Sequence, residues 1–174
     1  MEHPSVKNGI FGAIVIIIVY LILWFIAPKF FVAYGSWLGI LISFYFMYKA
    51  GKEARDANDG FISFSDVFKY LFLTVALLTF IVYFFNYVLY NFIDPGLMEV
   101  QKEIAQEAAE KIANAFGNED MIEEINDNMD DSMFQLTIWK TLQGWLFALV
   151  VGALFSAIMG AIMKKKNPAF DEFA

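Results

Sequence analysis

The chain contains, over residues 9–24, the uncharged stretch GIFGAIVIIIVYLILW. Lys7 and Lys29 are the nearest charged residues, so the uncharged run extends over residues 8–28. A bilayer core about 30 Å thick is crossed by roughly 20 helical residues. Inside a bilayer the backbone polar groups must be satisfied within the segment, which favours a helix over the strand that Val and Ile suggest. We therefore predict a spanning helix over residues 8–28.

Three further uncharged stretches of similar length follow, at residues 30–48, 70–93 and 141–163. Hydrophobic residues make up 59% of the 174 residues, against about 45–50% in ordinary soluble domains. We predict an all-α membrane protein, a single domain over residues 1–174 with four transmembrane helices, and disfavour a water-soluble enzyme. The first stretch is longer than the about 7–15 apolar residues of a signal peptide, and we expect it to be retained.

The positions of the Lys and Arg residues predict the orientation of the spans in the membrane. Four spans place both termini on one side of the membrane, together with the inner loop at residues 49–69. That side has eight of the twelve Lys and Arg residues, namely Lys7, Lys49, Lys52, Arg55, Lys69, Lys164, Lys165 and Lys166. The other side has Lys29, Lys102, Lys111 and Lys140. The excess predicts cytoplasmic N- and C-termini in a bacterial inner membrane.

The outer insert, residues 94–140, lies between the third and fourth spans and holds most of the acidic residues. Asp94-Pro95 is a typical helix start, with an N-cap carboxylate followed by proline at the first helical position. An apolar stripe at intervals of three and four follows, formed by Leu97, Val100, Ile104, Ala108 and Ile112. Gly117 is placed to end this helix. A second stripe consists of Met121, Ile122, Ile125 and Met129. We expect an extracytoplasmic acidic helical hairpin.

The acidity of this insert bears on its ligands. Residues 119–131 are rich in carboxylates but lack the order of ligands of an EF-hand loop. A solvated acidic face is therefore favoured over a calcium site. The same charge excludes nucleic acid as a partner and favours a basic protein or a cation-rich surface.

The inner loop combines a turn signal with aromatic residues. Asp59-Gly60 predicts a turn, and Ser63 with Asp66 fits a capping box that would start a helix. Phe61, Phe64 and Phe68 are candidates for a contact at the inner surface. Two interpretations stay open: an amphipathic segment lying in the head-group region, or the beginning of the third span.

Small residues form a ladder along the last span, where they recur at every fourth position: Gly144, Ala148, Gly152, Ser156 and Gly160. The second span offers a shorter ladder of Gly35, Gly39 and Ser43. Such ladders let helix backbones approach closely in membranes. The contact could lie within this bundle or with the helix of a partner, and we favour the internal contact.

The predicted spans contain no ionisable residue, which disfavours a proton relay, a charged substrate site or a voltage sensor. Among their polar residues, Asn86 and Gln143 are the candidates for an intramembrane polar site. There is no Cys, and the only His, His3, has no obvious second ligand or orienting carboxylate. The usual phosphate-loop, nucleophile-elbow and zinc-protease motifs do not occur. We therefore predict no catalytic, cofactor or metal site.

Several short motifs, in a fixed order, resemble a known family. They are Gly60-Phe-Ile-Ser-Phe64 with Phe68 four residues on, Asn91-Phe-Ile-Asp-Pro95 at the end of a span, and Lys164-Lys-Lys-Asn-Pro168 after the small-residue span. In this order they resemble the domain of unknown function 4199 family, small four-helix membrane proteins found mainly in Bacteroidetes. The resemblance covers essentially the whole chain, with Val67 at a position where Ala is expected. It implies no established activity and no catalytic residues.

The resemblance also implies a partner, because members of this family are often encoded beside a membrane-associated family-two glycosyltransferase. Our first hypothesis is a non-enzymatic inner-membrane accessory or scaffold subunit that binds and positions another membrane protein, with such a glycosyltransferase as one candidate. The alternative is a small oligomeric carrier or channel for a neutral or lipid-linked molecule. In that case the molecule would pass between polar positions such as Asn86 and Gln143.

Overall fold

The computed structural model describes residues 3–116 and 131–165. The helices are, in chain order, α1 (Pro4–Ile26), α2 (Pro28–Asp56), α3 (Phe64–Val88), the π-helical turn η1 (Leu89–Ile93), α4 (Leu97–Phe116), α6 (Asp131–Phe134) and α7 (Ile138–Met163). The helices α1, α2, α3 continued by η1, and α7 are long and apolar enough to cross a membrane. The predicted all-α membrane fold with four spanning helices is confirmed.

The spanning helices extend beyond the uncharged stretches from which they were predicted. The helix α2 continues to Asp56 and α3 begins at Phe64, so that only residues 57–63 of the predicted inner loop lie outside helices. Bilayer thickness sets a minimum length for a spanning helix. Charged residues beyond the uncharged core can therefore continue the same helix.

The turn between α1 and α2 consists of one residue, Ala27, and has a clear cause in the sequence. A residue before proline is disfavoured in the helical conformation. Ala27 lies outside the helical region, with φ of −149° and ψ of 75°, and Pro28 is the first residue of α2. The first two spans therefore form a tight helical hairpin.

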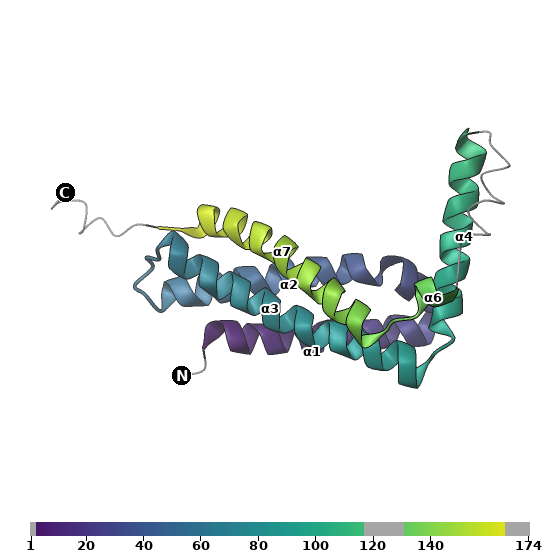
Figure 1. The fold of residues 1–174 in the computed structure, drawn as a ribbon. Helices are drawn as coiled ribbons and strands as arrows, with labels where there is room; N and C mark the ends of the chain where they lie inside the picture. The colour runs from purple at the N-terminus through teal and green to yellow at the C-terminus, as the bar shows by residue number, and fades with distance from the viewer. Residues whose placement is uncertain (1–2, 117–130, 166–174) are drawn as a thin grey trace.

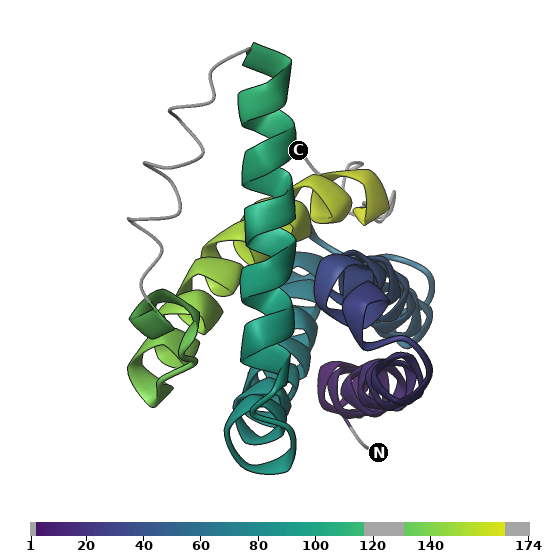
Figure 2. The same cartoon turned by 90° about the vertical axis from the view of Figure 1, so that its right-hand side faces the viewer.

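The four spanning helices form a bundle in which α7 crosses the others obliquely (Figure 1). The beginning of α1, the loop between α2 and α3 and the end of α7 lie at one end of the bundle, which we call the terminal end. At the opposite end, the α4 end, α4 lies across the bundle and extends away from it (Figure 2). Both termini of the membrane domain thus lie at the same end.

Two clusters of buried apolar side chains hold the bundle together. The larger one lies toward the α4 end and is centred on Ile16, Tyr20, Phe31, Phe46 and Leu78. The second lies toward the terminal end, and its members include Met47, Val67, Leu71, Val75 and Met163.

Side chains and backbone groups fasten the terminal end. The Ser63 hydroxyl accepts a hydrogen bond from the Asp66 backbone N–H, so the predicted helix start at Ser63 and Asp66 is confirmed. Ile62 and Lys165 exchange two backbone hydrogen bonds of 3.0 Å, which join the loop to the end of α7. In α1, the buried Ser5 donates to the backbone oxygen of Tyr70, whose ring stacks on His3.

The outer insert is described only in part. The predicted helix forms as α4, but it begins at Leu97, two residues after Pro95, the predicted first helical position. Ala108 and Ile112 of the predicted stripe are exposed, and Ala109 and Ala113 are the buried residues of this half of the helix. The second stripe, Met121, Ile122, Ile125 and Met129, lies outside the described residues, as do Gly117 and most of the carboxylate-rich stretch at 119–131.

Candidate functional site

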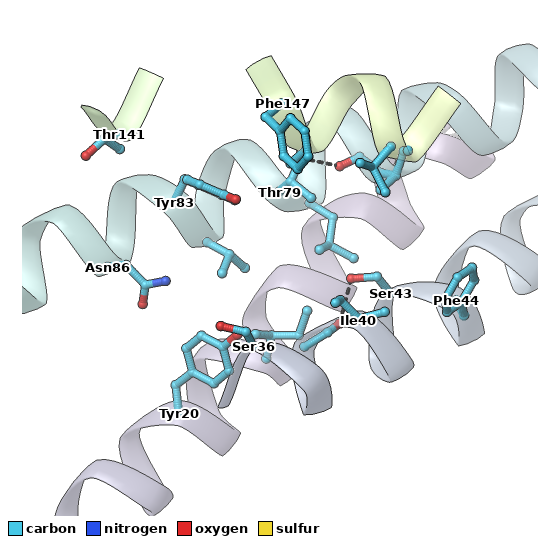
Figure 3. A pocket seen from close by; sticks show the side chains of 18 of the residues that line it. Tyr20, Ser36, Ile40, Ser43, Phe44, Thr79, Tyr83, Asn86, Thr141 and Phe147 are labelled. Atoms are coloured by element: carbon cyan, nitrogen blue, oxygen red, sulfur yellow. Dashed lines mark hydrogen bonds between the residues drawn. The ribbon is translucent and has the colours of Figure 1, made fainter. Parts of the chain in front are cut away.

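A cavity of about 530 Å³ lies inside the bundle, between α2, α3 and α7, with a wall from α1 (Figure 3). Ile40 of α2 and Phe147 of α7 line it and yet are 46% and 70% exposed, so the cavity opens between these two helices. At the other side of the opening, the rings of Phe44 and Phe155 meet edge to face, with centroids 4.7 Å apart. The oblique course of α7 produces this space, because α7 meets α2 near Phe44 and packs mainly on α3 elsewhere.

The lining of the cavity changes along its length. Toward the α4 end it contains hydroxyl and amide groups, which belong to Tyr20, Ser36, Tyr83, Asn86, Tyr90, Gln101 and Thr141. Toward the terminal end the lining is apolar and includes Phe44, Met47, Val75 and Phe155. Ser43 and Thr79 lie between these two parts. The cavity is therefore polar at one end and apolar at the other.

Asn86 is the most unusual polar residue of the lining. It projects from α3 into the polar part of the cavity (Figure 3). Its Oδ1 atom is buried and has no hydrogen-bond partner within the described part of the chain. A buried polar group left unpaired costs about 1–3 kcal/mol. A half-turn of the amide exchanges oxygen and nitrogen, so Asn86 can present a donor or an acceptor to a guest molecule.

Three hydroxyl groups of the lining donate their protons to the backbone of their own helices. Ser43 donates to the backbone oxygen of Gly39 at 2.7 Å, Thr79 to that of Val75 at 2.7 Å, and Thr141 to that of Thr137 at 3.0 Å. This back-bonding to the preceding turn is common for Ser and Thr in helices. What these three oxygens offer to a guest is their lone pairs, so they act as acceptors.

The lining residues, all within the described part of the chain, include no Asp, Glu, Lys, Arg or His. Within residues 3–116 and 131–165, no three carboxylate, His or Cys side chains come together as ligands for a metal ion. An ionised molecule would find no counter-charge in the cavity, and charge buried without a partner is strongly unfavourable. The site can bind by hydrogen bonding and apolar contact.

The polar end of the cavity is bordered by α4. Gln101 of α4 lines the cavity itself. Lys29, at the start of α2, contacts the carboxylates of Glu103 at 2.6 Å and Glu107 at 3.7 Å. At the start of α4, Asp94 accepts a 2.8 Å hydrogen bond from the Trp24 indole of α1. Both contacts fix α4 beside the cavity.

The end of α3 is shaped by a π-helical turn. In η1 the backbone N–H of Asp94 bonds to the carbonyl of Leu89, five residues back. Asn91 of this turn donates to the backbone oxygens of Tyr87 and Leu136 and so holds the chain before α7. Such turns are frequent at functional sites, and this one positions Tyr90 and Leu136, which both line the cavity.

The predicted small-residue ladder of α7 faces α3 and is used inside the bundle. A Cβ atom on Gly144 would lie 2.8 Å from the Tyr83 ring, and one on Gly152 would lie 2.9 Å from Val75. Gly160 lies against Phe64 and Val67. Ser156 is fully buried, and its hydroxyl has no partner within the described residues. Ala148 and Gly152 also line the cavity.

The ladder of α2 faces α1. A Cβ atom on Gly39 would lie 2.5 Å from the Tyr20 hydroxyl, and one on Gly35 would lie 3.7 Å from Cε1 of the same ring. Ser43, the third member, lines the cavity. Sequence reasoning missed Gly9 and Gly12 of α1, which let this helix approach Leu77 and Leu78 of α3. Their spacing of three residues within an apolar run was the available signal.

The other predicted residues do not gather at one place. Gln143 is exposed on α7 and does not line the cavity, so the structure does not bring it together with Asn86. Phe61, Phe64 and Phe68 lie at the terminal end, where the Lys165 ammonium is 5.4 Å from the centre of the Phe61 ring. Phe64 is 43% exposed, whereas Phe61 and Phe68 are half-buried.

Sequence reasoning also missed the hydroxyl groups of Tyr20, Ser36 and Tyr83 as parts of a site. Single hydroxyl groups are common in membrane helices. The available signal was that Tyr83 precedes Asn86 by three residues and that Tyr20 and Ser36 lie toward the same side of the membrane in their own spans.

Comparison with known proteins places the chain in one family. The model of the family described as "Protein of unknown function (DUF4199)" matches residues 7–165. No curated protein and no solved structure matches the chain. The matched range includes all of α2, α3, α4 and α7 and nearly all of α1. The resemblance seen in the short motifs is confirmed, and the chain belongs to the DUF4199 family.

Proposed function

We propose that the protein holds one amphipathic, lipid-like molecule in the cavity between α2, α3 and α7, as a non-enzymatic membrane carrier or binding protein. The observation that supports this most is Asn86, whose buried Oδ1 has no partner among the described residues and which lines a cavity that is polar at one end and apolar at the other. A volume of about 530 Å³ lies within the range of about 300–1,000 Å³ typical of small-molecule sites. The opening between Ile40 and Phe147 faces the lipid phase in a membrane-embedded bundle and gives a route of entry.

Retention of lipid during purification tests this proposal. The full-length protein would be isolated from its own host in mild detergent, and bound lipid would be measured by native mass spectrometry. Asn86→Leu is the test variant, and Gln143→Leu is the matched control because it makes the same kind of change on an exposed face of α7.

We expect one lipid per wild-type chain, the same for Gln143→Leu, and about tenfold less for Asn86→Leu, the effect of losing one buried polar contact. Ile40→Trp, which fills the cavity from its edge, should also displace the lipid. Equal lipid content in all four proteins, or none in the wild type, would refute the proposal. The elution profile in size-exclusion chromatography checks that each variant is folded.

A second candidate function is an accessory or scaffold subunit that binds another membrane protein, with a membrane glycosyltransferase as one candidate. What supports it is the shape and charge of α4, which extends beyond the bundle and carries exposed Glu99, Glu103, Glu107 and Glu110. The small-residue ladder no longer supports it, since those residues pack on α3. Loss of a co-purifying membrane protein after reversal of Glu99 and Glu110 to Lys would favour this function.

The location in a bacterial inner membrane, with cytoplasmic termini, is part of the proposal. It is supported by the eight basic residues on the side of the termini. In that orientation the polar end of the cavity lies toward the outer leaflet, and α4 lies on the extracytoplasmic surface. The loop with Phe61 and Phe64 then lies at the cytoplasmic surface.

A further inference from the structure

The lining of the cavity also indicates which class of lipid it would bind, an inference that rests on the proposed function. The first criterion is charge. None of the lining residues is an Asp, Glu, Lys, Arg or His. Of the basic side chains at the α4 end, Lys29 contacts Glu103 and Glu107, and Lys140 donates to the backbone oxygens of Ser132 and Met133. A phosphate or carboxylate headgroup in the polar part would therefore be buried without a counter-ion, which is unfavourable.

The charged residues around the polar end of the cavity also disfavour an anionic headgroup. The helix α4 borders the cavity through Gln101 and carries Glu99, Glu103 and Glu107 within two turns of that residue. The basic residues near them are Lys29, Lys102 and Lys140. An anionic headgroup that approaches from the α4 end meets a predominantly acidic surface. An uncharged headgroup avoids both the burial of an unpaired charge and the repulsion by this acidic surface.

The second criterion is hydrogen bonding. The Ser43, Thr79 and Thr141 oxygens act as acceptors, because their protons are used within their own helices. The Asn86 amide can accept or donate. A molecule that only accepts hydrogen bonds, such as a fully esterified lipid, would leave these oxygens unpaired. A hydroxyl group can donate its one proton to one of these oxygens and accept a hydrogen bond from the Asn86 amide.

The third criterion is the direction of the polarity. The polar lining lies at the α4 end and the apolar lining lies deeper in the bundle. A lipid whose headgroup sits near Asn86 therefore extends its chains toward Met47 and Val75 or out between Ile40 and Phe147. This is the direction of a lipid in the leaflet on the side of α4.

We infer that the occupant of the cavity is a lipid with an uncharged, hydroxyl-bearing headgroup, of which diacylglycerol is the simplest example. Its free hydroxyl donates to one of the back-bonded Ser and Thr oxygens and accepts from the Asn86 amide. Its acyl chains lie in the apolar part of the cavity and in the opening between α2 and α7.

Photolabelling with three matched lipids tests this inference. The full-length protein is placed in phosphatidylcholine nanodiscs that contain a trace of a diazirine-bearing diacylglycerol, its O-methyl ether, or the corresponding phosphatidic acid. The ether has the same chains but no hydroxyl proton, and the phosphatidic acid adds negative charge. Labelled peptides are then identified by mass spectrometry, with Asn86→Leu and Gln143→Leu as the paired variants.

We expect diacylglycerol to label cavity-lining peptides of α2, α3 and α7 about tenfold more than either control lipid, as for one well-placed hydrogen bond. Asn86→Leu should abolish the preference, and Gln143→Leu should keep it. Equal cavity labelling by diacylglycerol and its ether would overturn the hydroxyl criterion, and preferred labelling by phosphatidic acid would overturn the charge criterion. In both cases lipid binding itself stands. Labelling spread evenly over all lipid-facing peptides would overturn the proposed function as well.

Discussion

The indole N–H of Trp24 donates a 2.8 Å hydrogen bond to Oδ2 of Asp94, which joins the end of α1 to the start of α4. The other oxygen of the same carboxylate accepts from the backbone N–H of Gly96 at 3.1 Å. Asp94 thus combines a helix-start contact with a tertiary contact. Because α4 borders the polar end of the cavity, this carboxylate positions the wall of the proposed site.

Replacement of Asp94 should loosen α4. Asp94→Ala removes both hydrogen bonds, each of which contributes about 0.5–1.5 kcal/mol. Amides of residues 97–105 should therefore exchange faster with deuterium. Trp24→Phe is the matched control, since it removes the indole contact and keeps the Gly96 contact, and its effect should be smaller. Unchanged exchange in Asp94→Ala would show that α4 is held by its other contacts.

Glycine positions should differ in their tolerance of alanine according to the space that the structure leaves. A Cβ atom on Gly12 would lie 2.6 Å from Leu78 Cδ1 and 2.9 Å from the Phe46 ring. On Gly160 the nearest atom would be 3.4 Å away, an ordinary contact. Gly12→Ala should cost about 1–3 kcal/mol through overpacking, whereas Gly160→Ala should stay near the wild type. Unfolding in mixed micelles, followed by circular dichroism, measures both, and equal destabilisation would contradict the packing described.

Replacement by alanine should change the stability differently at two buried serines. Ser5 donates to the backbone oxygen of Tyr70 at 2.9 Å, and the Ser156 hydroxyl has no partner among the described residues. Ser5→Ala should cost about 0.6 kcal/mol, the average for a hydrogen bond between membrane helices. Ser156→Ala should leave stability unchanged or raise it slightly, because an unpaired hydroxyl is removed. A larger loss for Ser156→Ala than for Ser5→Ala would mean that Ser156 has a partner in the membrane.

The predicted orientation can be tested with single cysteines, since the chain contains none. Ala57 is exposed in the loop at the terminal end, and Ala108 is exposed on α4. In intact spheroplasts a membrane-impermeant maleimide should label Ala108→Cys and not Ala57→Cys. Labelling of Ala57→Cys should appear after the membrane is opened. The reverse pattern would place the termini outside and overturn the assignment from the basic residues.

The number and type of the spans followed from the sequence because bilayer thickness and backbone hydrogen bonding constrain them strongly. The turn at Ala27-Pro28 and the helix start at Ser63 also follow from local chemistry. The burial pattern in the second half of α4 did not, because Ala108 and Ile112 are exposed while their neighbours Ala109 and Ala113 are buried.

The cavity could not be predicted, because it depends on how the helices are rotated and tilted against one another. Asn86 and Gln143 are chemically alike and both lie near the α4 end of a span, yet only Asn86 lines the cavity. Which one does so is decided by the rotation of α3 and α7 about their axes. The opening likewise depends on the oblique crossing of α7, which leaves Ile40 of α2 uncovered.

The central claim is that a lipid occupies the cavity, and site-directed photocrosslinking tests it most directly. Benzoylphenylalanine would replace Ile40, which lines the cavity, or its neighbour Leu41, which is 65% exposed and does not line it. After irradiation of cells, intact-protein mass spectrometry gives the mass of each adduct. The account predicts one dominant lipid mass at position 40 and a mixture that reflects the bulk membrane at position 41. The same mixture at both positions would contradict it.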